Sequence, residues 1–395
     1  MAKNPTIIQT TLFDESDILP RGQNAKVDTI DSLPEHLMTL GKTEDLVELK
    51  NRVTALRNSI QLLQTDHGFI KVRENGQLID IRKDVLLSEL DQMVESHTLS
   101  RANYYLKRLV KSFNTSKVGK INDINLLRWK EYDDIITDSL WIIKKRDTSG
   151  AHLGWYWGNF IPQIPNQVMK RYTKKGDWIF DPFVGSGTTL IECRKLGRNG
   201  IGIELNGDVV EKARLLVDKE ENVHNVVTDI VGGDSATINI DEIANKYRIK
   251  KFQLIIAHPP YHDIINFSDD KRDLSRATSV QDFLDMFGRV VDNVSPLLEV
   301  NRYFVVVIGD KYTKGEWIPL GFYCMNEVLK RGYLLKSIIV KNFDETRAKR
   351  NQQELWRYRA LVGGFYVFKH EYILVFQKLP SKRTEVLTKN YREEK

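Results

Sequence analysis

Two short segments contain residue types and spacings that could do chemistry, and the first is a glycine-rich loop. Residues 181–189 (DPFVGSGTT) join an apolar run to a helical pattern that begins at Leu190. A glycine-rich turn between a strand and a helix lets a ligand approach the bare backbone at the mouth of a sheet. A phosphate-binding loop would need a lysine after its glycines, and a dinucleotide fingerprint would need a third glycine where this chain has Leu190. The loop therefore favours a nucleotide-like ligand that has no phosphate.

Acidic residues follow the next two predicted strands. Glu204 ends the strand after the loop, and Asp234 lies near the end of the third strand. A carboxylate at a strand end can accept both hydroxyl groups of a ribose. Together with Asp181, these residues suit a ligand with a ribose, an adenine and a positive charge, and S-adenosylmethionine has that description. The alternative is that Asp181 and Asp234 only cap helices and that Glu204 is a solvated strand end.

The second segment is rich in proline and follows the fourth predicted strand. It consists of residues 257–261 (AHPPY). Consecutive prolines restrict the backbone, so His258, Tyr261 and the carbonyl groups between them are held in place. A rigid polar pocket with an aromatic wall suits a planar base that carries an amino group. The backbone carbonyl and the first side chain would accept the amino hydrogens, and the tyrosine ring would stack on the base.

The elements that must position these segments alternate between strand and helix patterns from Asp177 onward. Short β-branched or apolar runs predict strands at residues 178–180, 200–203, 226–228, 252–256, 302–308, 334–341 and 371–377. Seven such runs separated by helical patterns predict a parallel or mixed sheet that is covered on both faces. The predicted fold class is α/β, with a mainly helical N-terminal appendage.

The chain is predicted to have four regions. Residues 1–40 are polar and broken by prolines, which favours an extended arm. Residues 41–125 are predicted to form a mainly helical domain with a hairpin. The α/β domain is expected to cover residues 126–380, and residues 381–395 are expected to form a charged tail.

Within the N-terminal region, the apolar positions from Leu46 to Leu63 lie on one helical stripe. A helix packed on its own domain is favoured over a short coiled-coil seam. Residues 69–81 are predicted to form a hairpin around Asn75-Gly76, and more helix is expected from about Asp84 to Phe113.

The composition is that of an ordinary folded protein with a small excess of positive charge. The 59 Lys and Arg residues against 53 Asp and Glu residues give a net charge of +6, which permits binding to a polyanion without requiring it. Two cysteines, Cys193 and Cys324, exclude a disulfide framework and a zinc-finger spacing. No apolar run has the length of a membrane helix, and the N-terminus has no apolar signal core. We therefore expect a cytoplasmic protein without a metal site or a membrane anchor.

The two motifs together resemble those of the amino-directed DNA methyltransferases, which methylate cytosine-N4 or adenine-N6. Residues 181–189 are similar to their cofactor motif, and residues 258–261 are similar to their Ser/Asn/Asp-Pro-Pro-Tyr/Phe catalytic loop. The resemblance covers about residues 150–380 and implies a Rossmann-like class I methyltransferase fold that uses S-adenosylmethionine. It implies cofactor binding by Phe160, Pro162, Asp181, Phe183, Gly185, Ser186, Gly187, Thr188, Glu204 and Asp234. It implies catalytic roles for His258, Pro259, Pro260 and Tyr261.

The sequence departs from the family pattern at the first residue of the catalytic loop. Family members commonly have serine there for cytosine or aspartate for adenine, whereas this chain has His258. A neutral imidazole nitrogen can accept an amino hydrogen. Residues 306–310 and 370–376 look more like the cytosine-N4 branch, so cytosine-N4 in a flipped base of duplex DNA is favoured over adenine-N6.

Other functions stay open at this point. A Pro-Pro-Tyr loop also suits an RNA amino-methyltransferase. Because His258 departs from the family pattern, a catalytically idle, DNA-binding protein of methyltransferase fold is a further alternative. Methylation at carbon 5 needs a cysteine nucleophile, usually after a proline, and neither Cys193 nor Cys324 has that setting. A restriction–modification role with a cognate restriction endonuclease is a further expectation.

Two positively charged segments are candidates for DNA contact. An insertion at about residues 343–366 has cations interleaved with aromatic residues, and it predicts DNA contacts by Arg347, Lys349, Arg350, Trp356, Arg357 and Arg359. Residues 101–120 have no acidic residue and form either a solvated helix face or a phosphate-contacting surface.

The N-terminal arm contains a possible partner motif. Gln9-Thr10-Thr11-Leu12-Phe13 is similar to the pentapeptide that binds the bacterial sliding clamp. An arm that packs on its own domain is the alternative.

Overall fold

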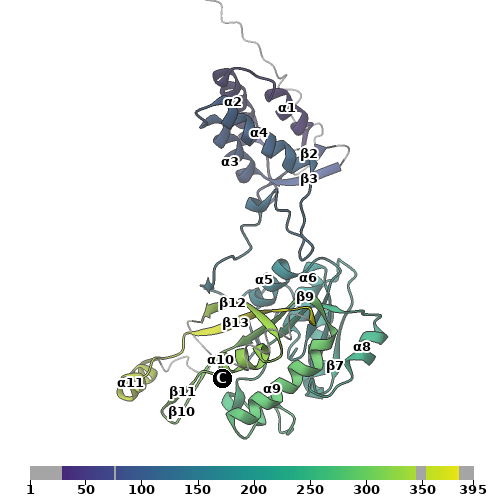
Figure 1. Cartoon of the computed structure of the whole chain (residues 1–395), viewed down its shortest axis with the longest axis vertical. Coiled ribbons are helices and arrows are strands. Elements are labelled where there is room, and N and C mark those ends of the chain that lie inside the picture. The colour runs from purple at the N-terminus through teal and green to yellow at the C-terminus, as the bar shows by residue number, and fades with distance from the viewer. Residues whose placement is uncertain (1–28, 75–76, 344–352, 382–395) are drawn as a thin grey trace, which may run out of the picture. The chain divides into compact units, whose positions relative to one another are not determined.

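The computed structural model divides into two compact units, which are described separately (Figure 1). The first unit contains residues 1–119 and 124–134, and the second contains residues 120–123 and 135–395. The residues that the structure describes are 29–74, 77–343 and 353–381. None of the helices in these described ranges is long and apolar enough to cross a membrane.

The N-terminal unit consists of a helical layer and a small sheet. Its elements are β1 (Thr29–Asp31), α1 (Leu33–Leu40), α2 (Leu46–Leu62), β2 (Phe69–Glu74), β3 (Gln77–Arg82), α3 (Lys83–Val94), α4 (Leu99–Asn114) and the 3-10 turn η2 (Trp129–Glu131). β2 pairs in parallel with β1 and antiparallel with β3, which confirms the predicted hairpin, although Asn75-Gly76 lie outside the described residues. The predicted apolar stripe is confirmed in α2, where Leu49, Val53 and Leu56 are buried.

The N-terminal unit differs from the sequence prediction in two places. The prediction of an extended arm as far as residue 40 is wrong from residue 29, because β1 and α1 occupy this part. Pro34 does not prevent the helix, since it lies in the first turn, where a missing N–H leaves no hydrogen bond unmade. The predicted helix over 84–113 is in fact two helices, and Thr98 begins the second by accepting a hydrogen bond from the Arg101 N–H (3.2 Å).

The second unit is built on one large mixed sheet. Its strands are β4 (Leu140–Trp141), β5 (Trp178–Asp181), β6 (Asn199–Glu204), β7 (Thr228–Gly232), β8 (Phe252–Ala257), β9 (Leu298–Ile308), β12 (Tyr333–Asn342) and β13 (His370–Lys378). The strand order is β4-β12-β13-β9-β8-β5-β6-β7, and β13 runs antiparallel to both of its neighbours. The other neighbouring pairs are parallel. The predicted α/β class with a mixed, Rossmann-like sheet is confirmed.

The sheet differs from the prediction in strand number and in one strand position. It has eight strands rather than seven, because β4 joins the edge at β12. A strand of two residues is too short to show a periodicity in the sequence. The third predicted strand, 226–228, instead lies at Thr228–Gly232.

Helices cover both faces of this sheet. They are α5 (Gln163–Tyr172), α6 (Thr188–Leu196), α7 (Gly207–Asp218), α8 (Ile240–Lys246), α9 (Val280–Val294) and α10 (Leu320–Leu329). A further helix, α11 (Gln353–Gly363), contributes no residue to the buried clusters on either face. The 3-10 turns η3 (His262–Ile264), η4 (Leu274–Arg276) and η5 (Ser295–Leu297) and the small hairpin of β10 (Lys311–Thr313) and β11 (Glu316–Ile318) complete the unit.

Alternate residues of the strands point to opposite faces, so the sheet has two cores. Phe180 and Phe304 belong to a core with residues of α8, α9 and α10, whereas Ile179 and Val305 belong to a core with residues of α5, α6 and α7. The parallel strands β5, β6, β7 and β8 end at the same edge of the sheet, and the loops that follow them meet there.

Candidate active site

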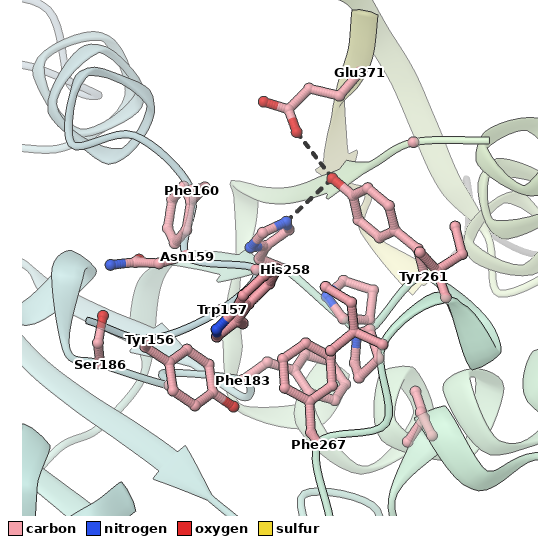
Figure 2. A pocket seen from close by; sticks show the side chains of 18 of the residues that line it. Tyr156, Trp157, Asn159, Phe160, Phe183, Ser186, His258, Tyr261, Phe267 and Glu371 are labelled. Atoms are coloured by element: carbon pink, nitrogen blue, oxygen red, sulfur yellow. Dashed lines mark hydrogen bonds between the residues drawn. The ribbon is translucent and has the colours of Figure 1, made fainter. Parts of the chain in front are cut away.

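A pocket of about 930 Å³ lies at this edge, in the second unit (Figure 2). The loops after β5, β6, β7 and β8 all contribute to its wall. Of the residues predicted from the sequence, it is lined by Phe160, Phe183, Gly185, Ser186, Glu204, Asp234, His258, Pro259, Pro260 and Tyr261. The structure therefore brings the glycine-rich loop and the proline-rich loop to one cavity.

The glycine-rich loop needs its glycines for steric reasons. Gly187 has a φ of 86° and precedes α6, and a Cβ atom there would lie 2.6 Å from Cγ2 of Val217. Gly185 also has a positive φ, 49°, and its Cβ would lie 3.0 Å from Cε1 of Tyr156. Both positions keep the turn tight and leave its backbone open to the pocket.

Glu204 combines a structural and a potential binding role. Its Oε2 accepts a hydrogen bond from the Gly185 N–H (3.1 Å), and its Oε1 accepts one from the Asn206 N–H (2.9 Å). Burial raises the pKa of Glu204 above its usual value. Each carboxylate oxygen has a further lone pair for ligand hydroxyl groups. Asp234 lines the pocket too, and its Oδ1 accepts from the Ala236 N–H (2.9 Å).

Asp181 differs from the prediction, because its carboxylate does not line the pocket. Its side chain is completely buried, and its two oxygens accept hydrogen bonds from the Thr189 hydroxyl (2.5 Å) and the Phe183 N–H (2.9 Å). Burial raises the pKa of Asp181 to about 7. The side chain of Asp181 therefore holds the loop, and its carboxylate lies behind the residues that line the pocket.

Three other residues that were predicted to bind the cofactor do not line the pocket. Pro162, Gly187 and Thr188 are buried but are not part of the lining. The Thr188 hydroxyl donates to Oδ1 of Asn159 (2.6 Å), which does line the pocket. Pro162 directly precedes α5 and lies two residues after Phe160, which lines the pocket.

A chain of hydrogen bonds leads away from the proline-rich loop (Figure 2). Nε2 of His258 lies 3.1 Å from the hydroxyl oxygen of Tyr261, and this hydroxyl donates to Oε2 of Glu371 (2.9 Å). Lys341 donates from Nζ to Oε1 of the same carboxylate (2.9 Å). Both Glu371 and Lys341 are buried and line the pocket.

Sequence reasoning missed Glu371 and Lys341, although a signal was present. They are direct cross-strand partners on β13 and β12, in strands whose other residues are mostly apolar. Charged side chains are almost never buried unless they are paired. Charged residues of opposite sign in two apolar strands could therefore have pointed to this pair.

The surroundings of His258 favour its neutral form. Burial lowers the pKa of His258 to about 4, while Glu371 raises it and Lys341 lowers it. Burial and the neighbouring Glu371 raise the pKa of Tyr261 well above its ordinary value. The centroids of the Phe160 and His258 rings are 5.0 Å apart in an edge-to-face arrangement, so the imidazole is also held by packing.

A second histidine–tyrosine–carboxylate chain lies in the same unit. Nε2 of His370 is 3.1 Å from the hydroxyl oxygen of Tyr372, and this hydroxyl donates to Oδ2 of Asp310 (3.2 Å). Asp310 also accepts hydrogen bonds from Nε1 of Trp317 (3.1 Å) and from the Gly321 N–H (2.9 Å). His370 and Asp310 line the pocket, so the two chains share one cavity.

Two residues that were not predicted give the pocket unpaired hydrogen-bond donors. Nη1 of Arg146 donates to the Phe160 carbonyl (2.9 Å), but its buried Nε and Nη2 have no partner among the described residues. Nδ2 of Asn159 is likewise buried and without a partner in the described part of the chain. Burial lowers the pKa of Arg146, and the neighbouring Asp147 offsets only part of this effect.

These donors and acceptors fit S-adenosylmethionine. Nε and Nη2 of Arg146 and Nδ2 of Asn159 have no acceptor among the described residues, and the carboxylate of an amino-acid group would provide one. Glu204 and Asp234 line the pocket with acceptors that suit ribose hydroxyls and an adenine amino group. The signal for Arg146 and Asn159 is absent from the sequence, because both lie in an irregular segment between β4 and α5.

Aromatic side chains form much of the remaining wall. The rings of Tyr156 and Phe267 are stacked, with centroids 5.7 Å apart, and those of Tyr312 and Phe365 are stacked at 4.1 Å. All of them line the pocket. Such walls suit a flat ring system, which can stack on them.

The predicted DNA-contacting residues fall into two groups. Trp356, Arg357 and Arg359 lie on α11, where Trp356 lines the pocket and the two arginines are exposed. The Arg359 guanidinium lies 5.3 Å from the centroid of the Trp356 ring. Arg347, Lys349 and Arg350 lie outside the described residues, as does the Gln9–Phe13 motif.

The positively charged segment of the N-terminal unit lies partly on α4, whose apolar face is buried in that unit's core. Arg101 donates to the Tyr105 hydroxyl (3.0 Å), and Arg108 forms an ion pair with Glu89. Lys107 and Lys111 are exposed. Arg108 is therefore paired within the unit, while the exposed Lys107 and Lys111 are compatible with both a solvated face and a phosphate-contacting surface.

Neither cysteine is placed for catalysis. Cys193 and Cys324 are buried and do not line the pocket, and burial raises the pKa of both thiols well above its usual value. A thiolate nucleophile for methylation at carbon 5 is therefore lacking at this pocket. Within the described ranges, no group of three or more His, Cys, Asp or Glu residues could hold a metal ion.

The sequence matches the model of the N6/N4 family described as DNA methylase, over residues 87–215 and 252–395. It is 33% identical over 112 residues to Type II methyltransferase M.MjaII of Methanocaldococcus jannaschii, covering 25% of this chain and 21% of that protein. It is 38% identical over 116 residues to Type II methyltransferase M2.DpnII of Streptococcus pneumoniae, covering 28% of this chain and 38% of that protein. The chain thus spans well under half the length of these relatives.

A methyltransferase from Pyrococcus furiosus is similar among solved structures. Its TM-score is 0.36 and its sequence identity is 13%, over 58% of this chain and 88% of that chain.

Proposed function

Since the chain belongs to the N6/N4 DNA methylase family, we propose that it transfers a methyl group from S-adenosylmethionine to an exocyclic amino nitrogen in duplex DNA. One observation carries this proposal. The glycine-rich loop with Glu204 and the rigid loop from His258 to Tyr261 line the same pocket. A methyl donor and an amino acceptor held in one cavity can react without a diffusive search for each other.

The cofactor end of the pocket is the part around Gly185 and Ser186. Here Glu204 and Asp234 would accept hydrogen bonds from ribose and adenine, and Arg146 and Asn159 would donate to the methionine carboxylate. When bound, S-adenosylmethionine supplies an electrophilic methyl group on a positively charged sulfur. The buried guanidinium group of Arg146 would orient the amino-acid part by donating a charge-assisted hydrogen bond to its carboxylate.

The base end of the pocket is the proline-rich loop. A base in duplex DNA must leave the stack to reach such a pocket, and the ring of Tyr261 would stack on it. His258 and the Pro259 carbonyl would each accept one hydrogen of the amino group. These two hydrogen bonds orient the nitrogen and increase the electron density on it. After transfer, His258 can accept the proton that the nitrogen releases and then pass this proton to water.

Cytosine-N4 is the favoured target. Residues 306–310 and 370–376 resemble the cytosine-N4 branch of the family more than the adenine-N6 branch. Adenine-N6 is the alternative, because both bases present an amino group from which His258 could accept a hydrogen bond. The relatives named above are Type II methyltransferases, which supports a modification role alongside a cognate restriction endonuclease.

DNA contact is assigned to the region of α11. Arg357 and Arg359 are exposed, and Trp356 connects this helix to the pocket wall. Exposed arginines beside an aromatic ring suit phosphates and unstacked bases. Arg357→Ala with Arg359→Ala should weaken DNA binding and reduce its salt dependence by about one unit of slope per lost phosphate contact. An unchanged slope would remove this assignment.

The proposed reaction is tested by identifying its product. The protein is incubated with isotopically labelled S-adenosylmethionine and mixed-sequence duplex DNA, and the DNA is digested to nucleosides for mass spectrometry. We expect labelled N4-methylcytosine, and N6-methyladenine would assign the other base. The same assay with RNA and with His258→Ala provides the controls. Label in RNA alone would contradict a DNA substrate, and label in carbon-5 methylcytosine would contradict amino transfer.

A further inference from the structure

The partners in the hydrogen-bond chain at His258 determine which atom carries each proton. Glu371 forms a buried ion pair with Lys341, in which Nζ lies 2.9 Å from Oε1. In this ion pair the carboxylate is the anion, and an ionised carboxylate can only accept hydrogen bonds. The hydroxyl hydrogen of Tyr261 must therefore point to Oε2 of Glu371, at 2.9 Å.

The direction of this hydrogen bond determines the tautomer of His258. A tyrosine hydroxyl has one hydrogen, so towards His258 it can act only as an acceptor. Nε2 of His258, at 3.1 Å, must then carry the proton and donate it to the Tyr261 oxygen. A neutral imidazole has a single N–H, so Nδ1 is left with a free lone pair.

The unprotonated nitrogen belongs to a residue that lines the pocket. Nδ1 has no hydrogen-bond partner in the described part of the chain, and the ring is held between Phe160 and Tyr261. Pro259, the next residue, restricts the backbone of His258 as well. The pocket therefore presents an acceptor of fixed position that is matched to a donor on the ligand.

We propose that Glu371 is a positioning residue that acts through Tyr261 to fix His258 as a hydrogen-bond acceptor. This inference rests on the proposed function and adds a basis for its specificity. A pocket whose acceptor is locked in this way selects a base with an amino group and disfavours one with a carbonyl at the same place.

The proposal makes the hydroxyl of Tyr261 necessary in this chain. The resembling motif has tyrosine or phenylalanine at this position, and a phenylalanine ring would serve equally well for stacking. With His258 as the first residue, loss of the hydroxyl removes the acceptor for Nε2–H. Either imidazole nitrogen could then carry the proton, and a fraction of the molecules would present a donor to the target amino group.

The tautomer is measured directly by NMR. Long-range proton–nitrogen correlation spectra of the full chain, recorded without DNA, report which ring nitrogen of His258 is protonated. We expect Nε2–H in the unchanged protein, a mixture of tautomers in Tyr261→Phe, and no change at His258 in the matched control Tyr372→Phe. A proton on Nδ1 in the unchanged protein would overturn the proposal whether or not the protein methylates DNA.

The functional consequence is measured by single-turnover transfer. Glu371→Gln and Tyr261→Phe should each lower kcat roughly tenfold or more, because each frees the hydrogen-bond direction, with little change in cofactor affinity. Glu371→Gln leaves the buried Lys341 without its carboxylate and can fail to fold, so Tyr261→Phe decides the question in that case. An unchanged kcat for folded Tyr261→Phe would overturn the proposal. The two failures are distinguishable. If His258 carries its proton on Nε2 but the protein methylates no nucleic acid, the proposed function is overturned and the hydrogen-bond assignment stays intact.

Discussion

The pocket contains two histidine–tyrosine–carboxylate chains with similar distances. His258 and His370 each lie 3.1 Å from a tyrosine hydroxyl, and each hydroxyl donates to a carboxylate, at 2.9 Å for Glu371 and at 3.2 Å for Asp310. The histidine–tyrosine and tyrosine–carboxylate distances alone do not distinguish the two chains. Their different surroundings must therefore decide what each chain does.

The two carboxylates have different further partners. Asp310 also accepts hydrogen bonds from the Gly321 N–H and the Trp317 indole, so it joins the start of α10 to the β10–β11 hairpin. Glu371 has only Lys341 as a further partner in the described residues, and its chain ends at the proline-rich loop. One chain joins secondary-structure elements, and the other ends at His258, to which we assign the catalytic role in our proposal. The element at which each chain ends therefore distinguishes the two histidines.

The largest expected difference between the two chains is in methyl transfer. His258→Ala removes an acceptor for the target amino group and should lower kcat by about 1,000-fold. His370→Ala should change kcat little, because its chain does not reach the proline-rich loop. Single-turnover transfer with saturating cofactor measures both. Equal losses in the two variants would break the comparison.

Stability should show the opposite difference. Asp310→Ala leaves the buried Gly321 N–H and the Trp317 indole without their acceptor, which should lower the free energy of unfolding by about 2–3 kcal/mol. Chemical denaturation measures this change, and His258→Ala serves as the reference, since removal of its imidazole leaves no backbone group unpaired. An Asp310→Ala protein as stable as His258→Ala would contradict the fastening role.

Cofactor binding should depend on neither chain. Arg146→Met keeps the length of the side chain but removes the donors that fit a carboxylate, so the Kd for S-adenosylmethionine should rise roughly tenfold. Calorimetry of the isolated protein measures this without any turnover, and the exposed Lys144→Met is the matched control. An unaffected Kd would show that Arg146 does not hold the carboxylate.

The smallest expected effect concerns pH. The pKa of His258 is lowered from 6.5 to about 4, so the folded protein keeps the ring neutral at pH values where an unfolded chain is protonated. Its contribution to stability is fully present above 6.5 and is lost as pH falls from 6.5 towards 4. The profile of kcat should therefore be flat through 6.5 and decline only near 4. An acidic limb centred at 6.5 that disappears in His258→Asn would contradict a neutral, buried ring.

The sequence predicted the parts of the site that are continuous in the chain. The loop 181–189 and the segment 258–261 are short strings in which glycine and proline restrict the backbone, so their conformation and their placement after strands could be inferred. The α/β class followed from the same alternation of strand and helix patterns. The edge strand β4 was missed because two residues carry no periodic signal.

Residues that act across the fold could not be predicted in this way. Glu371 reaches Tyr261 only because β13 lies in the middle of the sheet, and Arg146 reaches the pocket from an irregular segment. Asp181 was predicted to bind the ligand because it ends a strand, but its carboxylate is completely buried and does not line the pocket. All of these features concern side-chain partners and burial, which depend on packing and not on spacing along the chain.

The central claim is that His258 accepts a hydrogen bond from the target amino group because Tyr261 fixes the tautomer of His258. A double-mutant cycle tests this claim most directly. Single-turnover rates are measured for Tyr261→Phe in the unchanged protein and in the His258→Asn background. An asparagine oxygen accepts a hydrogen without a tautomer to set. The account predicts that Tyr261→Phe lowers the rate roughly tenfold when His258 is present and hardly at all in His258→Asn. The same loss in both backgrounds would show that the hydroxyl acts on the base or on the fold rather than through His258.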